Sequence, residues 1–231
     1  MPATDAADAT RVIAVKWIKN NILSAIIYAV ISLLLDGLGY AVRDATSEIG
    51  LVLSWIYFLI GIASWTFAGI AEGVLTGAVL QRIVPFLPVR NWIALHAGIA
   101  AILFVFFRAL GPARSGGAVD VDQATIGLGL VVAVILGAIV GALIGGLQAL
   151  VLRGVALGTG SWIRWAAAAY AVGMVIWTCS DTLLDLDTGL AGMLARQVIE
   201  FVAAVIGAVI MLPALSQLKS RTLTLAGQHF T

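Results

Sequence analysis

Long uninterrupted apolar segments constrain this chain more than any other feature of its sequence. Apolar runs of about 20 residues, each long enough to span a bilayer, recur along the chain, and 61% of its 231 residues are hydrophobic. Only 11% are charged, against roughly 25% in soluble domains. Lipid admits only helices or closed barrels, and barrel strands would alternate apolar and polar residues. The sequence therefore predicts an all-α, polytopic membrane helix bundle.

We expect six transmembrane helices that pair into three helical hairpins. The expected spans are residues 17–41, 48–82, 91–109, 124–152, 162–181 and 190–218. The chain then divides into a tail (1–11), three hairpins (12–85, 86–153 and 154–218) and a second tail (219–231). The Gly-rich segment 110–123 is expected to form an external turn. No segment is left for a soluble domain, so any function should lie inside the bundle, on its lipid face or on short rims.

Basic residues gather on one side of the predicted spans and set the orientation. Nine of them share that side: Arg11, Lys16, Lys19, Arg82, Arg90, Arg153, Arg164, Lys219 and Arg221. The opposite side carries Arg43, Arg108 and Arg114. Short loops rich in Lys and Arg stay in the cytoplasm, so we expect both termini to be cytoplasmic. The acidic start MPATDAADAT lacks the basic region of a cleaved signal peptide, which favours a retained anchor in a bacterial inner membrane.

The three hairpins share a recurring pattern. Each begins with Trp-Ile and ends near a glutamine on the cytoplasmic rim: Trp17, Trp92 and Trp162, with Gln81, Gln148 and Gln217. The second helices carry glycine stripes: Gly69, Gly73 and Gly77, then Gly137, Gly141 and Gly145, with Gly207 as a remnant. Glycine at every fourth position lets another helix approach closely, and tryptophan suits the membrane interface. We expect the second helix of each hairpin to lie centrally, in three-fold pseudo-symmetry, and the tryptophans to lie in the interfacial belt.

The segment GALIGGLQALVLR, from Gly141 to Arg153, resembles a pattern in uncharacterised bacterial multi-pass membrane proteins. In those proteins G-x-x-x-G-x-x-Q is followed by an aromatic residue, by Leu-Arg and by a Trp-containing helix, in repeated copies. Here Ala149 stands at the aromatic position, and the first copy has Gln81 one residue later and no Leu-Arg. The likeness covers most of the chain as architecture but only these 13 residues as a motif. It implies repeated hairpins and, because that family has no assigned activity, no function.

Glu72 is the most unusual ionisable residue within the predicted spans. It lies ten residues before Arg82, about 15 Å along the helix and near the middle of the hydrocarbon core. Ionisable groups at that depth are costly and mark candidate functional sites, so Glu72 could hold a proton, a cation or another ligand. Two alternatives remain open. Glu72 could be a protonated carboxyl bonded to a neighbouring helix, or the helix could break near Gly69–Gly73 and admit water.

The other candidate ligand residues are His96, Arg196 and Glu200. His96 lies among small residues that could admit a flat tetrapyrrole with the imidazole as its ligand, and the alternative is a hydrogen-bonded histidine. Arg196 and Glu200 are one helical turn apart, so an internal salt bridge is the alternative to a ligand site. We also expect Asn20, Asn21, Gln81 and Gln148 to form hydrogen bonds across helices.

The sequence favours a non-enzymatic role. It has no phosphate-binding loop, no H-E-x-x-H, no paired cysteines and no basic aromatic stripe, so no catalytic residue, metal site or nucleic-acid partner is predicted. The favoured interpretation is a helix-packing accessory or scaffold subunit of a membrane complex, in contact with lipid and with other subunits or itself. The first alternative is a small-solute transporter or membrane-embedded substrate-binding component that uses Glu72. Weaker alternatives are a pigment-associated subunit with His96 as ligand and an enzyme acting on lipid.

Overall fold

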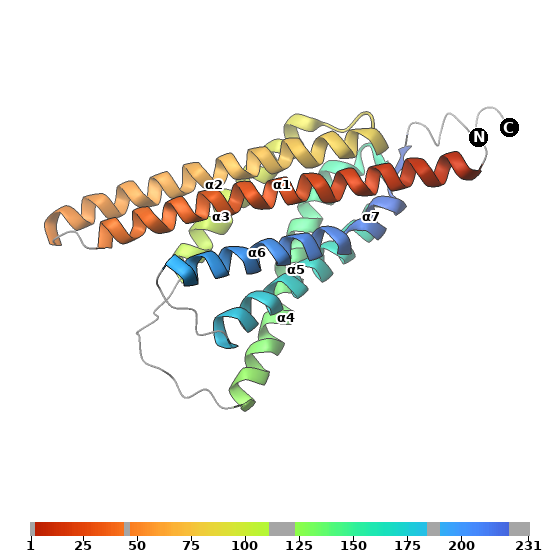
Figure 1. Cartoon of the computed structure of the whole chain (residues 1–231). Coiled ribbons are helices and arrows are strands. Elements are labelled where there is room, and N and C mark those ends of the chain that lie inside the picture. The colour runs from red at the N-terminus through yellow and green to blue at the C-terminus, as the bar shows by residue number, and fades with distance from the viewer. Residues whose placement is uncertain (1–2, 44–46, 111–122, 184–189, 222–231) are drawn as a thin grey trace.

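The computed structural model describes residues 3–43, 47–110, 123–183 and 190–221 (Figure 1). Six long helices follow one another: α1 (Ala3–Arg43), α2 (Ser47–Ile83), α3 (Val89–Leu110), α4 (Gln123–Arg153), α5 (Thr159–Leu183) and α6 (Leu190–Ile210). A short α7 (Leu212–Gln217) and two strands, β1 (Ala156–Leu157) and β2 (Lys219–Ser220), complete the described chain. Most of the expected turn at 110–123, and the tail beyond residue 221, lie outside the described residues.

The described chain is a helical membrane protein. Five stretches within it are long and apolar enough to cross a bilayer: Thr10–Leu35, Val52–Ile83, Val89–Phe106, Gly127–Arg153 and Leu194–Gln217. The 25-residue α5 is not among these five. The prediction of an all-helical membrane bundle is therefore confirmed. The prediction of six spans stays a prediction, because only five of the six long helices contain a described stretch that is long and apolar enough to cross a bilayer.

Two helix limits differ from the predicted ones. α1 begins at Ala3 and so extends into the expected tail 1–11. The last predicted span, 190–218, is divided at Met211 into α6 and α7. Pro213 lies in the first turn of α7, where its missing N–H and fixed φ are tolerated, whereas inside a continuous helix they would break a backbone hydrogen bond.

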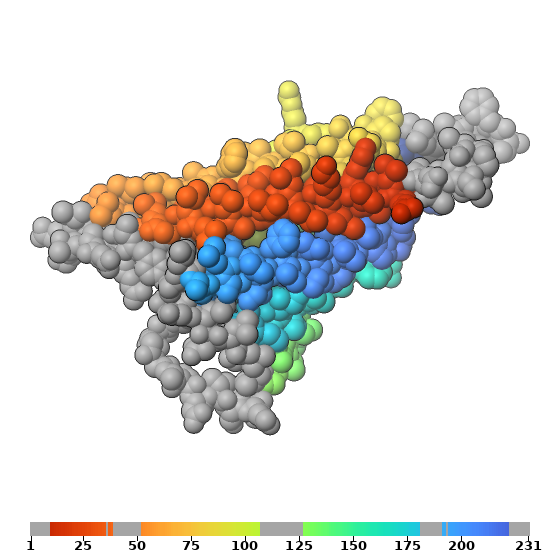
Figure 2. All heavy atoms as spheres, in the orientation of Figure 1, coloured from red at the N-terminus to blue at the C-terminus, as the bar shows by residue number. Residues whose placement is uncertain are grey.

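Helices that are neighbours in sequence are neighbours in space. The most extensive contacts are those of α4 with α5 and of α2 with α3, and α6 returns to pack on α1. Figure 2 shows α6 lying along α1. By contrast α3 and α4 contact each other only slightly, and no substantial contact joins α2, α4 and α6 among the described residues. The expectation that these even-numbered helices cluster centrally is therefore wrong.

The helices gather at one end of the bundle. The start of α1 and the end of the described chain both lie there, and at the opposite end the tip of α4 stands away from the α1–α2 pair (Figure 1). Most of the hydrophobic core belongs to the gathered end, because it is formed by residues near the helix ends that meet there. Its largest members are Trp17, Trp92, Trp162, Met211, Leu80, Leu87, Leu152, Leu215 and Leu218.

Trp17, Trp92 and Trp162 meet within this core, and we call them the tryptophan hub. The ring of Trp162 lies 5.9 Å from that of Trp17 and 6.0 Å from that of Trp92, both in edge-to-face geometry. Their exposed fractions are only 4%, 0% and 1% in chain order. These residues therefore lie inside the bundle and not on its outer surface, and their depth in the membrane stays a prediction. Edge-to-face stacking and burial of large rings stabilise the hub.

Each indole of the hub donates a hydrogen bond to an even-numbered helix. Trp92 Nε1 donates to Thr76 Oγ1 of α2 at 3.0 Å, and Trp162 Nε1 donates to Gln148 Oε1 of α4 at 2.8 Å. Trp17 Nε1 donates to the carbonyl oxygen of Ala208 on α6 at 3.1 Å. Each bond thus joins an odd-numbered helix to the even-numbered helix before it, if α6 is taken to precede α1.

The glycine stripes face the following helix in the chain. A Cβ on Gly69 would lie 2.5 Å from the backbone oxygen of His96 in α3, and one on Gly141 would lie 2.5 Å from that of Ala166 in α5. The other glycines of the two stripes also face α3 or α5, at 2.6–3.2 Å from the nearest atom: Gly73, Gly77, Gly137 and Gly145. Gly207 has more room, with Ala169 Cβ at 3.9 Å. The predicted close approach therefore takes place within the chain.

A small antiparallel sheet ties the connection between α4 and α5 to the end of the described chain. Ala156 pairs with Ser220 and Leu157 with Lys219, and the N–H of Arg221 donates to the carbonyl oxygen of Val155 at 3.0 Å. Gly158 ends β1 with φ +84°, next to the carbonyl of Gln217. A side chain there would be strained by φ and would collide with that carbonyl. The sheet adds a small non-helical element that the sequence did not predict.

We predict that replacing Gly141 with alanine destabilises the bundle by about 1–3 kcal/mol, because the added methyl group collides with the α5 backbone. Gly146 is the matched control, because it lies in the same helix and a Cβ there meets nothing within 4 Å. Gly146→Ala should leave stability unchanged or raise it slightly. Unfolding followed by tryptophan fluorescence in lipid or detergent measures both variants. Equal effects of the two substitutions would contradict the packing described here.

Candidate functional site

Glu72 lies in a cluster formed by side chains from three helices. Tyr28 of α1 donates its hydroxyl hydrogen bond to Glu72 Oε2 at 3.2 Å. Tyr170 of α5 lies within electrostatic range of both Glu72 and Tyr28. All three side chains are half-buried. A carboxyl and two phenols, about midway along their spans, therefore lie near one another inside the bundle, and we call them the Glu72 cluster.

The glycine stripes position this cluster. Gly69 and Gly73 flank Glu72 and hold α2 against His96 and Ile93 of α3. On the other side, a Cβ on Gly141 of α4 would lie 2.7 Å from Tyr170 Cβ, so close packing of α4 fixes the place of Tyr170. α2 continues through Gly69–Gly73 as an unbroken helix, which overturns the alternative of a helix break beside Glu72.

The turn that carries Glu72 is also linked to the tryptophan hub. Thr76 is 2% exposed, and its hydroxyl donates to the backbone carbonyl of Glu72 at 2.7 Å while accepting the Trp92 indole N–H. Asn20 of α1 donates to the backbone carbonyl of Leu75 at 2.6 Å. These bonds join α1, α2 and α3 immediately beside the cluster, on the side of the gathered helix ends.

His96 and Gln148 bridge the weakly packed pair α3 and α4. His96 Nδ1 donates to the backbone carbonyl of Trp92 at 2.9 Å, which leaves Nε2 of the neutral ring as an acceptor. Gln148 Nε2 donates to His96 Nε2 at 3.2 Å, and its Oε1 accepts from Trp162. The donor and acceptor ends of the Gln148 amide are therefore both assigned by their partners.

These bonds bear on the ligands considered for His96. Both of its ring nitrogens already have protein partners, and its ring lies 4.6 Å from that of Trp92. A metal bound to Nε2 would have to displace Gln148. Among the described residues there is also no group of three or more His, Cys, Asp or Glu side chains that could hold a metal ion.

The other predicted polar residues do not join the Glu72 cluster. Arg196 is half-buried and Glu200 is exposed on α6, and their predicted ion pair stays a prediction. Gln81 and Gln217 are exposed. Asn21 donates to the backbone carbonyl of Trp17 within its own helix at 2.8 Å, so the expectation of a bond across helices is wrong for Asn21 and right for Asn20 and Gln148.

An aromatic row connects the Glu72 cluster to the opposite end of α2. Its five rings are Trp55, Phe58, Phe104, Trp65 and Tyr28, and consecutive centroids lie 6.0, 6.0, 5.9 and 5.6 Å apart. The ring of Phe104 from α3 lies directly over Gly61, where any Cβ would collide with it. Sequence reasoning missed Tyr28, Tyr170 and this row. The available signal was the presence of two tyrosines in mid-span and of aromatic residues at intervals of three and seven along 55–65.

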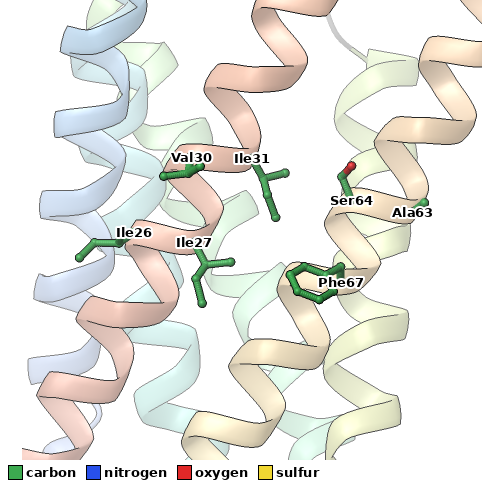
Figure 3. A pocket seen from close by; sticks show the side chains of 7 residues that line it. All are labelled: Ile26, Ile27, Val30, Ile31, Ala63, Ser64 and Phe67. Atoms are coloured by element: carbon green, nitrogen blue, oxygen red, sulfur yellow. The ribbon is translucent and has the colours of Figure 1, made fainter.

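An apolar groove of about 500 Å³ lies between α1 and α2 (Figure 3). It is lined by Ile26, Ile27, Val30, Ile31, Ala63, Ser64 and Phe67. Several of these side chains are exposed, as lipid-facing residues of a membrane protein are. With one hydroxyl among its lining residues, the groove offers little chemistry beyond apolar contact.

Comparison with known proteins does not identify the chain: no family model matches it, and neither curated proteins nor solved structures include a significant match. The resemblance of the Gly141–Arg153 segment to uncharacterised bacterial membrane proteins therefore stays an expectation.

We predict that Gln148→Leu destabilises the bundle by about 1–3 kcal/mol, because it leaves the buried Trp162 N–H and His96 Nε2 without partners. Gln81→Leu is the matched control, since Gln81 is exposed at the end of α2. The free energy of unfolding in lipid measures both variants. If Gln148→Leu were as stable as Gln81→Leu, the bridge between α3 and α4 would be energetically unimportant.

Proposed function

We propose that the chain crosses a bacterial inner membrane six times, with both termini in the cytoplasm. The 25 residues of α5 extend about 37 Å, which exceeds the roughly 30 Å of hydrocarbon. The ends of α2 and α4, the starts of α1, α3 and α5 and the end of the described chain carry the nine basic residues, and eight of the nine are exposed. This distribution supports placing the gathered helix ends at the cytoplasmic face.

Thiol labelling tests this orientation. Cys179 is the only cysteine, so a Cys179→Ser background allows single cysteines to be added. Phe86 is 64% exposed between α2 and α3, and Phe86→Cys should react with a membrane-impermeant thiol reagent in inverted vesicles but not in intact cells. Gly127→Cys, at the opposite end of α4, should show the reverse. Labelling of Phe86→Cys in intact cells would invert the proposed topology.

We infer that the protein is a membrane-embedded solute-binding or transport component whose site is the Glu72 cluster. The observation that carries this proposal is the convergence of Tyr28, Glu72 and Tyr170 from three different helices. A carboxyl in mid-membrane is costly, and here it is half-buried instead of sealed. One phenol donates a single bond to Glu72 Oε2, so the carboxyl keeps acceptor capacity for a ligand.

The scaffold role draws less support. Its argument rested on glycine stripes that offer a smooth face to partner proteins, and those stripes face α3 and α5 of the same chain. The side chains on the outer surface are large and apolar, as lipid alone requires, so they do not call for a protein partner. No catalytic constellation is proposed.

The proposal predicts that Glu72→Gln abolishes solute binding without unfolding the bundle. Gln keeps the size of the side chain and its ability to accept from Tyr28 while removing the charge. The full chain in lipid nanodiscs is screened for thermal stabilisation by amines, metal ions, neutral vitamins and carboxylates, and a ligand at 100 times its Kd should stabilise it by about 2.7 kcal/mol.

Glu200→Gln is the matched control, because it neutralises an exposed carboxyl of α6. It should keep the stabilisation that Glu72→Gln loses. If no solute class stabilises the wild type, or if every stabilising solute acts equally on Glu72→Gln, the cluster is not a solute site and its carboxyl is a structural hydrogen-bond acceptor.

A further inference from the structure

The aromatic row gives the Glu72 cluster a lining of a particular chemistry. Trp55 lies 17 residues before Glu72 on α2, so the outer end of the row is about 25 Å along the helix from the carboxyl. Trp55 is 61% exposed, whereas Phe104 in the middle of the row is 7% exposed. The rings therefore continue from the outer surface of the bundle to the carboxyl inside it.

The two sides of Glu72 along the bundle differ. On one side of Glu72 the bundle is closed by the tryptophan hub, where Trp92 is fully buried and Leu80 and Leu152 pack beside it. On the other side the helices spread (Figure 1), and the aromatic row extends in that direction. The aromatic row therefore runs from the Glu72 cluster away from the hub.

Gln197 of α6 is a buried acceptor at about the same level of the bundle as Tyr28. The Trp17–Ala208 bond fixes α1 and α6 side by side. Counted from that bond, Tyr28 lies 11 residues along α1 and Gln197 lies 11 residues along α6. Eleven residues are close to three full turns, so Gln197 lies on the Ala208 face of α6 at about the level of Tyr28. It is 8% exposed, and its Oε1 has no hydrogen-bond partner among the described residues. A buried acceptor without a donor favours a positively charged guest over an anionic one.

We propose that the solute is a hydrophobic organic cation, either an aromatic quaternary cation or a protonated aromatic amine. This proposal rests on the proposed function and names its substrate class. The faces of Trp and Tyr rings attract cations, more strongly where water is excluded. Stacked rings also accept the aromatic part of such a solute. The carboxylate of Glu72 then neutralises the charge at the inner end of the row.

Alternative ligands fit less well. A small metal ion prefers several oxygen ligands, and the described site offers one carboxyl. An anion would meet the Glu72 carboxylate. Arg196 adjoins Gln197 in sequence but lies about 100° around α6 from it, on a different face. The site therefore selects a solute that combines a positive charge with an aromatic surface.

Two ions of nearly equal size and opposite charge test the proposal. Tetraphenylphosphonium and tetraphenylborate are titrated into the full chain in nanodiscs of neutral lipid, with empty nanodiscs subtracted. We expect saturable binding of one tetraphenylphosphonium per chain and no saturable binding of tetraphenylborate. Glu72→Gln should weaken cation binding at least about tenfold, or about 1.4 kcal/mol, and Glu200→Gln should not.

Two substitutions on α2 separate the aromatic row from the lipid-facing groove. Trp65→Leu should weaken tetraphenylphosphonium binding several-fold, while Trp65→Phe, which keeps a ring and controls for misfolding, should retain it. Phe67→Leu should have no effect, because Phe67 lines the groove and not the row. Loss of binding in Phe67→Leu alone would instead assign the cation to the groove and overturn the proposal.

The outcomes also distinguish this proposal from the proposed function. If another solute class stabilises the wild type in a Glu72-dependent manner and tetraphenylphosphonium does not bind, the site exists and its assigned chemistry is wrong. Equal binding of the two ions to the wild type would show partition into lipid and would likewise overturn the assignment.

Discussion

Hydrocarbon offers no hydrogen-bond partner, so polar groups carried into the bundle depend on the bundle itself for their partners. This constraint explains the tryptophan hub. Three indole N–H groups, all buried, reach a backbone carbonyl, a threonine hydroxyl and a glutamine amide on three different helices. The acceptors are also engaged elsewhere: Thr76 donates to the Glu72 backbone and Gln148 donates to His96. The hub is therefore both an apolar core and the origin of the polar contacts that surround it.

The glycine stripes and the Glu72 cluster are parts of one arrangement. The glycines of α2 let α3 approach closely, and the glycines of α4 let α5 approach closely, because no bulky side chain lies between the paired helices. Tyr170 then reaches the neighbourhood of Glu72 from α5, and Tyr28 reaches it from α1. By contrast α3 and α4 contact each other slightly and depend on the Gln148–His96 bond. The bundle is thus firmly packed at five seams, those of α1–α2, α2–α3, α4–α5, α5–α6 and α6–α1, and lightly joined at the α3–α4 seam.

The helical structure of the chain was predictable from the sequence, because an apolar segment long enough to cross lipid has to be a helix. The places where another helix comes close were also predictable, since only close approach explains a four-residue glycine period. Their partner helices were not, because a stripe such as Gly69–Gly73–Gly77 says that a helix approaches but not which one. Trp17, Trp92 and Trp162 would suit either the membrane interface or the bundle core, and their place in the core followed only from the packing of the six helices. Glu72 was recognised as unusual, but Tyr28 was not, because a mid-span tyrosine is an ordinary residue until its hydroxyl has a partner.

The bond between Trp17 and Ala208 joins residues 191 positions apart. A ribosome adding about 5–20 residues per second takes roughly 10–40 s to synthesise the chain between them. During that interval the first helix is already made while its acceptor does not yet exist. The Trp17 indole of the nascent α1 therefore needs another partner until the last helix arrives. Formation of the contact between α1 and α6 is therefore a final event of synthesis. A chain truncated before α6 would leave Trp17 without the acceptor that holds it in place.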